Sequence, residues 1–550
     1  MSKYPIGVDF GTLSGRAVLV DVSTGEEIAT AVMDYPHGVL ERALPDGTPL
    51  PPQWALQHPQ DHLDVLFSTI PQVLTQSDVS AADIIGIGVD FTACTTLPVR
   101  ADGTPLCFEE KYRSRPHAWV KLWKHHGAQA QADRITALSA EYPDLLTRYG
   151  GKASCEWMFP KLLELLEEDE EIYNEADRII ESGDWIVWLL TGCEVRSMCQ
   201  AGYKAQWDPK TGYPAPEILK KLDPRLEHVA EEKLNAPMAP ITACAGGLTD
   251  AMAKKLGLLP GTPVAAANID AHSALPACGV CRPYDMLMIM GTSTCHHVMS
   301  PEAHAIDGLF GMVENGVLPG YYAYEAGQAC GGDHFAWVVN NITPESYAAE
   351  ARRRGLSLHQ LLQEKSCAQR PGGHGLLALD WFNGNRSILN DSKLSGMILG
   401  MTLTTRPEDI YRALIEATAY GTRIIIEAIE AGGVPVHDLY ACGGMAQKSP
   451  MLMQIYADVT GRTIRVAASK QASALGAAIH AAVAAGPECG GYATTAEASA
   501  RMARLQEGAY SPNAENKSIY DRLYAEYRTL YDYFGRGDND VMKRLMALRG

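Results

Sequence analysis

The sequence has no apolar stretch long enough to cross a membrane. Its longest apolar runs are broken by Gly, Arg, His or Asp well before the ~18 residues that a membrane-spanning helix requires. The opening segment MSKYPIGVDFG also lacks the basic stretch and apolar core of a secretory signal. We therefore expect neither secretion nor membrane insertion, and we expect a cytoplasmic protein.

Basic side chains are in short supply. The chain has 47 Lys and Arg against 65 Asp and Glu, which gives a formal net charge of -18. Affinity for DNA or RNA comes largely from Lys and Arg neutralising phosphates, so the composition argues against a nucleic-acid partner. A nucleotide or a neutral small molecule is the easier ligand.

Two common nucleotide-binding motifs are missing, and the cysteines lack metal-ligand spacing. Neither the P-loop pattern G-x-x-x-x-G-K-[ST] nor a strand-linked G-x-G-x-x-G is present, which disfavours a P-loop NTPase and a dinucleotide enzyme. Of the 13 cysteines only Cys278 and Cys281 form a C-x-x-C, and His296 and His297 are adjacent rather than spaced as ligands. We favour reduced, buried thiols over a zinc site and predict no structural metal.

The pattern of strands and turns begins twice along the chain. At 550 residues the chain exceeds one hydrophobic core, and roughly 100 to 200 residues per domain predicts at least two domains. Apolar runs predict strands at Tyr4–Phe10, Ala17–Asp21 and Glu27–Ala31, and after Pro260-Gly261 again at Val264–Asn268 and Met286–Met290. The sequence therefore predicts an internally repeated fold.

Strands alternate with helices in the second half. Periodicity and boundary residues predict helices at Pro407–Ala431, Pro450–Thr460 and Ser473–Ala485, with strands at Leu439–Cys442 and Thr463–Ala467. A polar helix from about Tyr520 closes the chain. Together with a hairpin at each domain start, this alternation predicts an α/β fold with mixed β-sheets.

The first strand ends in a turn suited to phosphate. In the segment Asp9 to Arg16, small residues let backbone N–H groups approach an anion, and Thr12 and Ser14 add hydroxyl donors. A carboxylate beside phosphate is repulsive unless a cation lies between them, so Asp9 suggests Mg2+. The alternative is an ordinary hairpin in which Asp and Gly favour the turn.

Two later turns have related chemistry. Gly291-Thr292-Ser293-Thr294 follows a strand at the start of the second half, and Cys442-Gly443-Gly444-Met445-Ala446 lies between a strand and a helix, where glycines permit close passage of adenine or ribose. Each turn alone is weak evidence, but the three in this order predict a nucleotide polyphosphate held between two domains.

Asp270 stands at the inferred junction between the two halves. It ends an apolar strand and precedes small residues, so it could be a helix N-cap. Its position also suits a base that reaches a sugar hydroxyl. His272 is the rival base, although we favour a packing role for it.

These segments resemble the FGGY carbohydrate kinases along nearly the whole chain. The resemblance is specific at GVDFGT from Gly7, VDFTACT from Val89, EWMFPK from Glu156, GDWIVW from Gly183, EAGQ from Glu325 and LDWFNGNR from Leu379. It implies two actin-like ATPase (ribonuclease H-like) domains with a cleft between them. We expect a sugar-binding domain over residues 1–275 and a nucleotide-binding domain with a C-terminal helix over residues 276–550.

The resemblance also implies roles for individual residues. Asp270 would be the catalytic base, and Asp9 and Asp270 would support Mg2+. The ketose would contact Ala93, Trp123, Lys204, Asp270 and Glu325, whereas Lys204 and Glu325 could otherwise be ordinary surface charges. ATP would contact Thr12, Ser14, Arg16, Gly291, Thr292, Gly443, Gly444 and Lys448.

The same resemblance favours the L-ribulose-phosphorylating branch of the family. It implies transfer of the ATP γ-phosphoryl group to the 5-hydroxyl of L-ribulose in L-arabinose catabolism, with Mg2+ as cofactor and a homodimer as the assembly. One alternative is a relative that acts on another ketopentose or a pentitol, such as D-ribulose, ribitol or xylulose. A second is an actin-like ATPase that acts on a protein partner.

Overall fold

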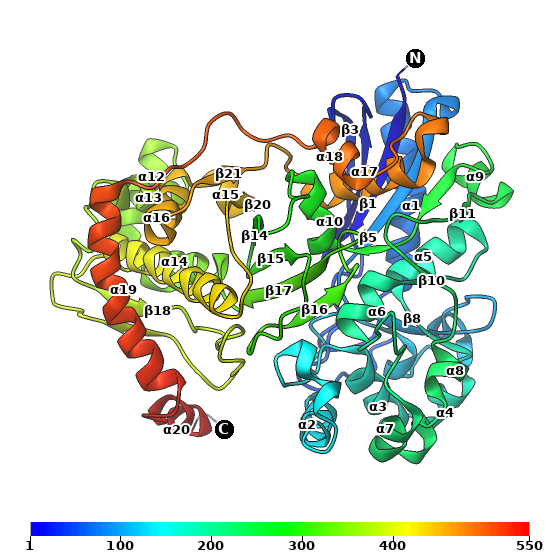
Figure 1. Cartoon of the computed structure of the whole chain (residues 1–550), viewed down its shortest axis with the longest axis horizontal. Helices are drawn as coiled ribbons and strands as arrows, with labels where there is room; N and C mark the ends of the chain where they lie inside the picture. The colour runs from blue at the N-terminus through cyan, green and yellow to red at the C-terminus, as the bar shows by residue number, and fades with distance from the viewer. Residues whose placement is uncertain (1, 549–550) are drawn as a thin grey trace.

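A computed structural model describes residues 2–548 and contains two large mixed β-sheets of the same plan (Figure 1). The first has the order β11-β12-β5-β1-β2-β3, and β13 pairs with β5 beside β12. Its central strands β1 and β5 are parallel, while β1, β2 and β3 form an antiparallel meander. The bounds are β1 Tyr4–Phe10, β2 Ser14–Val20, β3 Glu27–Asp34, β5 Ile84–Phe91, β11 Cys244–Gly247, β12 Pro263–Ala265 and β13 Asn268–Ile269.

The second sheet repeats this plan in the order β16-β17-β15-β14-β20-β21. Here β14, β15 and β17 form the antiparallel meander, and β14 runs parallel to β20 as β1 runs parallel to β5. The predicted repeat and the mixed α/β class are thus confirmed. The bounds are β14 Met286–Met290, β15 Thr294–Ser300, β16 Gly311–Glu314, β17 Tyr322–Gln328, β20 Leu439–Cys442 and β21 Ile464–Val466.

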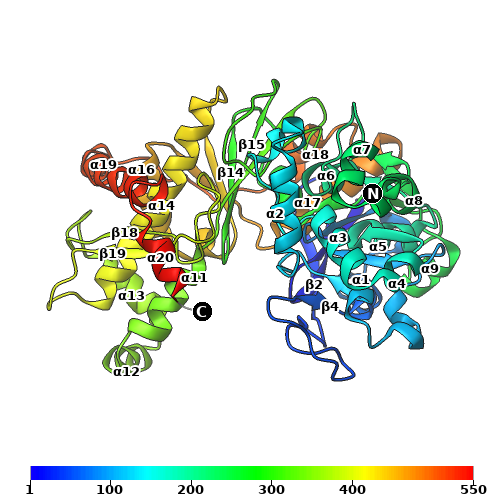
Figure 2. The ribbon, with the colours of Figure 1, turned by 90° about the horizontal axis from the view of Figure 1, so that it is seen from below.

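Each sheet has its own helical cover, and the two groups of helices lie on opposite sides of the molecule (Figure 2). The 25-residue α14 packs against α16 behind the second sheet, and its buried residues are mostly apolar but include the ion pair Arg412–Glu416. Apart from α17 and α18, the helices of the second half are α11 Gly332–Trp337, α12 Glu345–Arg354, α13 Leu358–Cys367, α14 Pro407–Ala431, α15 Gly444–Lys448, α16 Pro450–Thr460, α19 Ala514–Gly535 and α20 Val541–Ala547. A π-turn spans Val338–Ile342, and β18 Leu377–Leu379 pairs with β19 Met397–Leu399.

The first half carries additional helices beside a small sheet, β4-β7-β6-β8. Those strands are β4 Leu56–Gln57, β6 Thr96–Val99, β7 Val120–Lys121 and β8 Arg178–Glu181, and β9 Arg196–Ser197 pairs with β10 Met238–Ala239. The helices are α1 Pro59–Ser77, α2 Gln129–Leu138, α3 Met158–Glu168, α4 Glu170–Glu175, α5 Ser182–Thr191, α6 Met198–Lys204, α7 Pro216–Leu222, α8 Val229–Lys233, α9 Asp250–Leu256 and α10 Asp270–Ala277. Between Val99 and Trp157 the chain forms five short 3-10 turns in addition to β7 and α2.

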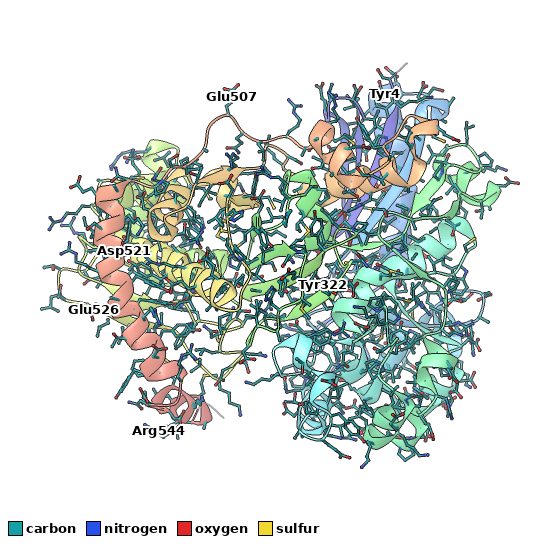
Figure 3. The ribbon with its side chains drawn as sticks, viewed as in Figure 1. Tyr4, Tyr322, Glu507, Asp521, Glu526 and Arg544 are labelled. Carbon is teal, nitrogen blue, oxygen red and sulfur yellow. The ribbon has the colours of Figure 1, made fainter. Side chains whose placement is uncertain are left out.

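The chain returns to the first sheet after completing the second. Helix α17 (Ala472–Ala485) packs on β1 and β5, and α18 (Thr495–Met502) follows it there. Glycines make this contact possible, because a Cβ at Gly7 would lie 1.8 Å from the Ala474 carbonyl oxygen and one at Gly88 would lie 1.9 Å from that of Ala477. Glu507 lies on the segment that then crosses back toward α19 (Figure 3).

Helices α10 and α17 also pack on each other at a glycine. A Cβ at Gly476 would lie 1.7 Å from the Ser273 carbonyl oxygen, so the two backbones touch there. Helix α10 follows directly from β13 of the first sheet, whereas α17 follows β21 of the second. The pair therefore joins the two halves, and the predicted division at residues 275 and 276 stays a prediction.

Most element boundaries agree with the sequence prediction. The helices over Pro407–Ala431 and Pro450–Thr460 and the strand over Leu439–Cys442 are confirmed at both ends. The single strand predicted over 264–268 is wrong, since it is divided into β12 and β13 by Ala266 and Ala267, and the last long helix begins at Ala514. Within residues 2–548, no helix is long and apolar enough to span a bilayer.

Candidate active site

The turn between β1 and β2 is held by its own side chains. The Gly11 N–H donates to the Ser14 carbonyl at 3.0 Å and closes the turn. The Arg16 guanidinium lies 3.2 Å from Asp9 Oδ2 and donates to Ser14 Oγ at 2.9 Å. Asp9 and Arg16 are register partners on β1 and β2, so the hairpin itself brings the carboxylate and the guanidinium together.

Two side chains from other elements position Thr12 in this turn. Gln57 of β4 donates through Nε2 to the Thr12 carbonyl at 2.9 Å, and Trp123 donates its indole N–H to Thr12 Oγ1 at 3.0 Å. Trp123 therefore contacts the first turn, and its predicted role as a wall of the sugar site stays a prediction. Gln57 is a positioning residue that sequence reasoning missed, because its contact with Thr12 is visible only after folding.

Three acidic residues converge at the carboxyl ends of adjacent strands. Asp9 is the residue before the last of β1, Asp90 is its register partner on β5, and Asp270 follows β13, whose Asn268 pairs with Asp90. Burial and the Asp9 carboxylate raise the pKa of Asp90 well above its usual range. Asp90 was not among the predicted site residues, although Ile84–Val89 repeats the strand-then-acid pattern of β1 and could have indicated it.

Asp270 lies at the start of α10, and the pKa of its carboxyl is close to neutral pH. Its Oδ1 accepts from the Ala271 N–H at 2.6 Å, so it serves the first turn of the helix while Ile269 occupies the N-cap position. Burial, assisted by the charges of Asp9 and Glu325, raises the pKa of Asp270 to about 7, and the Ala271 N–H and the Lys204 ammonium act in the opposite direction. A carboxylate with such a pKa can accept a proton at physiological pH.

Lys204 and Glu325 form an ion pair that links the two halves. Lys204 ends α6 of the first half and Glu325 lies on β17 of the second, with Nζ 3.0 Å from Oε2. Although burial opposes ionisation, the Lys204 ammonium helps to hold the pKa of Glu325 near 2. Both side chains are at most 15% exposed, so neither is the solvated surface charge of the alternative interpretation.

His272 is enclosed beside this pair. Its Nε2 lies 3.7 Å from Glu325 Oε2, and its ring packs against Tyr203 and His297 with centroid distances of 4.2 and 4.5 Å. Burial lowers the pKa of His272 well below its usual value. The ring is therefore neutral and enclosed, as the packing role favoured for it requires, and the assignment of Asp270 as the base stays a prediction.

Ala93 lies in a loop fixed to the same junction. The neighbouring Thr92 N–H donates to the Phe10 carbonyl at 3.1 Å, which holds the loop against the end of β1. On the other side of Ala93, Cys94 has a positive φ of 46°. The buried Lys161 donates to the carbonyls of Cys94 and Leu122 at 2.6 and 2.8 Å, and it thus fixes the chain beside both Ala93 and Trp123.

The second and third glycine turns meet at the end of β14. The carbonyls of Gly291 and Thr292 accept from the N–H groups of Gly332 and Gly331 at 2.9 and 2.7 Å. Gly443 has a φ of 94°, and a Cβ there would lie 2.6 Å from the Met290 carbonyl oxygen. Only glycine suits this close, left-handed position.

Gly444, Cys295 and Lys448 lie on or next to the second and third turns. Gly444 has no atom within 4 Å of where its Cβ would be, so its surface is open to a ligand. Cys295, just after the second turn, is close enough to Glu325 and Asp270 that burial and these two carboxylates raise the pKa of its thiol to about 12. Lys448 is exposed at the end of α15, and its contact with ATP stays a prediction.

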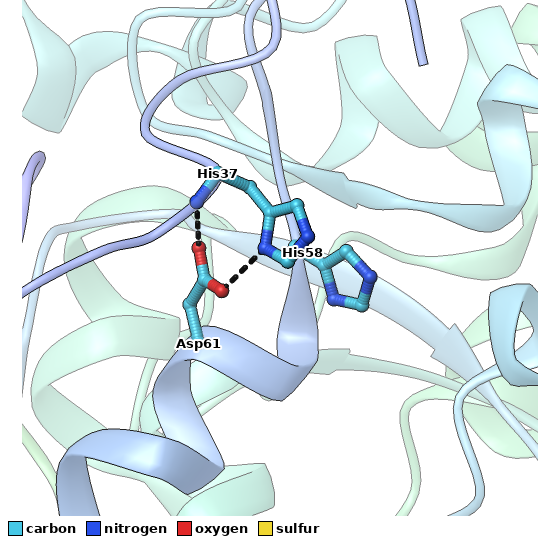
Figure 4. Close-up of side chains that lie close together, drawn as sticks. All are labelled: His37, His58 and Asp61. Atoms are coloured by element: carbon cyan, nitrogen blue, oxygen red, sulfur yellow. Dashed lines mark hydrogen bonds and ion pairs between the residues drawn. The ribbon is translucent and has the colours of Figure 1, made fainter. Parts of the chain in front are cut away.

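A separate polar cluster caps helix α1 (Figure 4). His37 Nδ1 lies 2.6 Å from Asp61 Oδ1, and the His58 ring stacks on His37 with centroids 4.2 Å apart. His58 Nδ1 accepts from the Gln60 N–H, as an N-cap does. Because the two rings are stacked, their nitrogen lone pairs run side by side rather than toward one point, so we interpret this cluster as a helix cap.

Comparisons with known proteins identify the family of this chain. Residues 4–276 match the N-terminal domain of the FGGY family of carbohydrate kinases, and residues 286–485 match its C-terminal domain. The chain is 53% identical over 550 residues to a protein of Halalkalibacterium halodurans named ribulokinase, covering 100% of this chain and 98% of that one. It is 54% identical over 539 residues to the ribulokinase of Bacillus licheniformis, with 98% of each chain covered.

Solved structures share the fold at low sequence identity. A xylulose kinase from Rhodospirillum rubrum superposes with a TM-score of 0.78 at 23% identity, covering 96% of this chain and 98% of that one. A gluconate kinase from Lactobacillus acidophilus gives a TM-score of 0.80 at 18% identity, covering 98% and 99%. With both family domains matched and relatives above 50% identity along the whole chain, this protein belongs to the FGGY family of carbohydrate kinases.

Proposed function

We propose that this chain transfers the γ-phosphoryl group of ATP to the 5-hydroxyl of L-ribulose, giving L-ribulose 5-phosphate and ADP. The names of its full-length relatives support the choice of sugar. The observation that carries the proposal is the position of Asp270. Its carboxylate is near enough to Asp9 of the first turn, and to Glu325 and Lys204 of the ion pair, for the charges of all three to act on its pKa.

In this proposal Asp270 orients the 5-hydroxyl and accepts its proton as the new oxygen–phosphorus bond forms. Phosphoryl transfer passes through a loose transition state, so most of the acceleration comes from alignment and from positive groups around the phosphate oxygens. A pKa of about 7 allows Asp270 to be ionised before transfer and to hold the proton afterwards.

The acidic residues at the sheet edge fit a hard divalent cation. Carboxylate oxygens are ligands that Mg2+ prefers, and Asp90 has two buried oxygens without a hydrogen-bond partner among residues 2–548. Asp9 and Asp270 would hold Mg2+ together with the ATP phosphates. When bound, the ion would neutralise the charge that develops on the phosphate oxygens.

The other predicted residues divide between the two substrates. We propose that the Lys204–Glu325 pair binds hydroxyl and carbonyl groups of the ketose through charge-assisted hydrogen bonds, with Ala93 and Trp123 completing its site. ATP would be held along the three glycine turns by Thr12, Ser14, Arg16, Gly291, Thr292, Gly443, Gly444 and Lys448.

We also propose that the chain acts in the cytoplasm as a homodimer. All thirteen cysteines are free thiols, which supports a reducing compartment. The dimer rests on the family resemblance. Analytical ultracentrifugation of the full chain would test it, and a single monomeric species at micromolar concentration would contradict it.

A coupled ADP-release assay over a panel of ketoses and pentitols tests the proposed reaction. We expect kcat/KM to be highest for L-ribulose, with the product identified as the 5-phosphate by phosphorus–proton coupling in NMR spectra. Preference for D-ribulose, ribitol or xylulose would assign the chain to another branch of the family. Rapid ADP release without any sugar would favour the ATPase alternative.

A further inference from the structure

Asp90 has no role in the proposed phosphoryl transfer, although its surroundings are unusual for a carboxylate. Asp90 is completely buried, and among residues 2–548 no amide, guanidinium or alcohol group donates to either carboxylate oxygen; the side chain within hydrogen-bonding reach is the Asp9 carboxyl. Buried carboxylates in proteins are nearly always paired with a donor or a cation. The nearby Arg16 reaches Asp9 Oδ2 and Ser14 instead.

Strand register fixes which residues Asp90 faces. Register partners on adjacent strands direct their side chains to the same face of a sheet, so Asp9 and Asp90 lie side by side. On the other side of β5, Asn268 of β13 pairs with Asp90, and Asp270 follows two residues later. Asp90 thus stands on the strand between those that carry the two predicted Mg2+ ligands.

The same face carries the contact with α17, and this explains why Asp90 is enclosed. Gly7 and Gly88 lie two residues before Asp9 and Asp90 and touch the backbone of α17 at Ala474 and Ala477. Asp9 and Asp90 therefore lie just beyond the start of this helix. The unpartnered N–H groups and the dipole of a helix N-terminus favour negative charge there, but they leave the oxygens of Asp90 without a bonded donor.

We propose that Asp90 is a further ligand of the Mg2+ that accompanies ATP, binding it through a carboxylate oxygen alongside Asp9. This inference rests on the proposed function, since it requires a nucleotide-bound divalent cation at the first turn. It explains why a carboxylate is retained at a buried position where a neutral side chain would pack without an unmet hydrogen bond.

The substitution Asp90→Asn tests this assignment, because it keeps the shape and removes the carboxylate that would bind the ion. We would measure Mn2+ affinity by electron paramagnetic resonance on the full chain saturated with the non-hydrolysable analogue AMP-PNP. We expect the variant to bind Mn2+ at least tenfold more weakly, while its unfolding temperature without metal is unchanged or raised. Mn2+ affinity within twofold of the wild type would overturn the proposal and leave a proton shared with Asp9 as the explanation.

Asp184→Asn is the matched control. Asp184 is also buried, but its Oδ1 accepts from the Ser197 N–H at 3.1 Å, and the charged groups that act on it are Arg196, Glu181 and Glu194. We expect this variant to retain the Mn2+ affinity of the wild type. An equal loss in both variants would indicate a general effect of removing a buried acid and would also overturn the proposal.

A measurement on the unmodified chain tests the proposal even if Asp90→Asn does not fold. Fe2+ in place of Mg2+, with AMP-PNP and hydrogen peroxide, cuts the backbone next to the metal ligands. Mass spectrometry should find cuts beside Asp9, Asp90 and Asp270, whereas cuts at Asp9 and Asp270 without one at Asp90 would exclude Asp90. These metal assays omit the sugar, so failure of the proposed L-ribulose kinase activity is detected separately in the wild-type panel assay.

Discussion

Asp270 is the residue on which the proposed chemistry depends most directly. Replacing it with Asn removes the proton acceptor and leaves the three glycine turns intact. We expect turnover to fall by about 10²–10⁴-fold, the usual contribution of a general base. The Kd of ATP measured by equilibrium binding without Mg2+, where Asp270 has no metal to hold, should change less than about threefold. Turnover near that of the wild type would remove Asp270 from the role of base.

The raised pKa of Asp270 gives a pH dependence with a definite sign. The ionised form is the active base, so kcat/KM for the sugar should rise as pH increases through the pKa of Asp270 and then level off; this pKa is about 7 without a metal, and bound Mg2+ would lower it. The folded-state pKa lies above the value of 3.8 for a free side chain, so the stability linked to this group is lost as pH rises from about 4 through 7. Asp270→Asn should therefore raise the unfolding temperature more at pH 8 than at pH 5, and a larger gain at pH 5 would contradict this sign.

Substitutions in the Lys204–Glu325 pair can distinguish its role in sugar binding from its role in the stability of the fold. Lys204→Met leaves a buried carboxylate without its partner, which costs about 3–5 kcal/mol by analogy with other buried pairs. We expect lower kcat/KM for the sugar, unchanged KM for ATP, and a lower unfolding temperature. The double variant Lys204→Met with Glu325→Gln should recover stability but not sugar binding, as measured by calorimetry. Recovery of both would indicate a purely structural pair.

At this scale the sequence indicated Asp9 and Asp270 but not Asp90 or Gln57. The first two follow apolar strands directly, a pattern that is visible locally. Asp90 follows an apolar strand in the same way, but its place beside Asp9 emerges only from strand register, because β5 is brought beside β1 by pairing across about eighty residues of chain. The contact of Gln57 with Thr12 likewise depends on the position of the small sheet.

At the scale of elements, the glycines that contact α17 should differ in how strongly an added Cβ destabilises the protein. A Cβ at Gly7 would meet the backbone of Ala474 at 1.8 Å, whereas one at Gly86 would meet that of Ala481 at 2.9 Å. Overpacking of a core typically costs about 1–3 kcal/mol, and an overlap with rigid backbone costs more. We expect Gly7→Ala to lower the unfolding temperature far more than Gly86→Ala, as measured by circular dichroism. Equal effects would mean that α17 moves freely over the sheet.

Element boundaries were predictable wherever proline and glycine mark them. Pro407 and Gly432 flank the 25-residue α14, and Pro450 and Gly461 flank α16. The break between β12 and β13 was not predictable, because Ala266 and Ala267 are buried and apolar like a continuing strand. Which sheet α17 covers was also hidden, since its alanine-rich sequence is buried along most of its length.

At the scale of the molecule, the two halves are joined by the α10–α17 contact and by the Lys204–Glu325 pair. A kinase must keep water from the γ-phosphate, so we expect the halves to close when the sugar binds. Small-angle X-ray scattering should detect a smaller radius of gyration with L-ribulose than without it, and ADP release without sugar should be slow. Sugar-independent ADP release as fast as transfer would contradict this closure.

The return of α17 to the first sheet affects the order in which the protein can be made. Residues 4–91 supply the central strands early in synthesis, yet the helix that covers their glycine-lined face ends at residue 485. Contacts between such distant segments form slowly, because a long loop of chain must first be closed. One face of the first sheet is therefore still uncovered when its central strands leave the ribosome. A nascent chain that stalls before residue 472 would keep this face exposed and would be a natural substrate for chaperones.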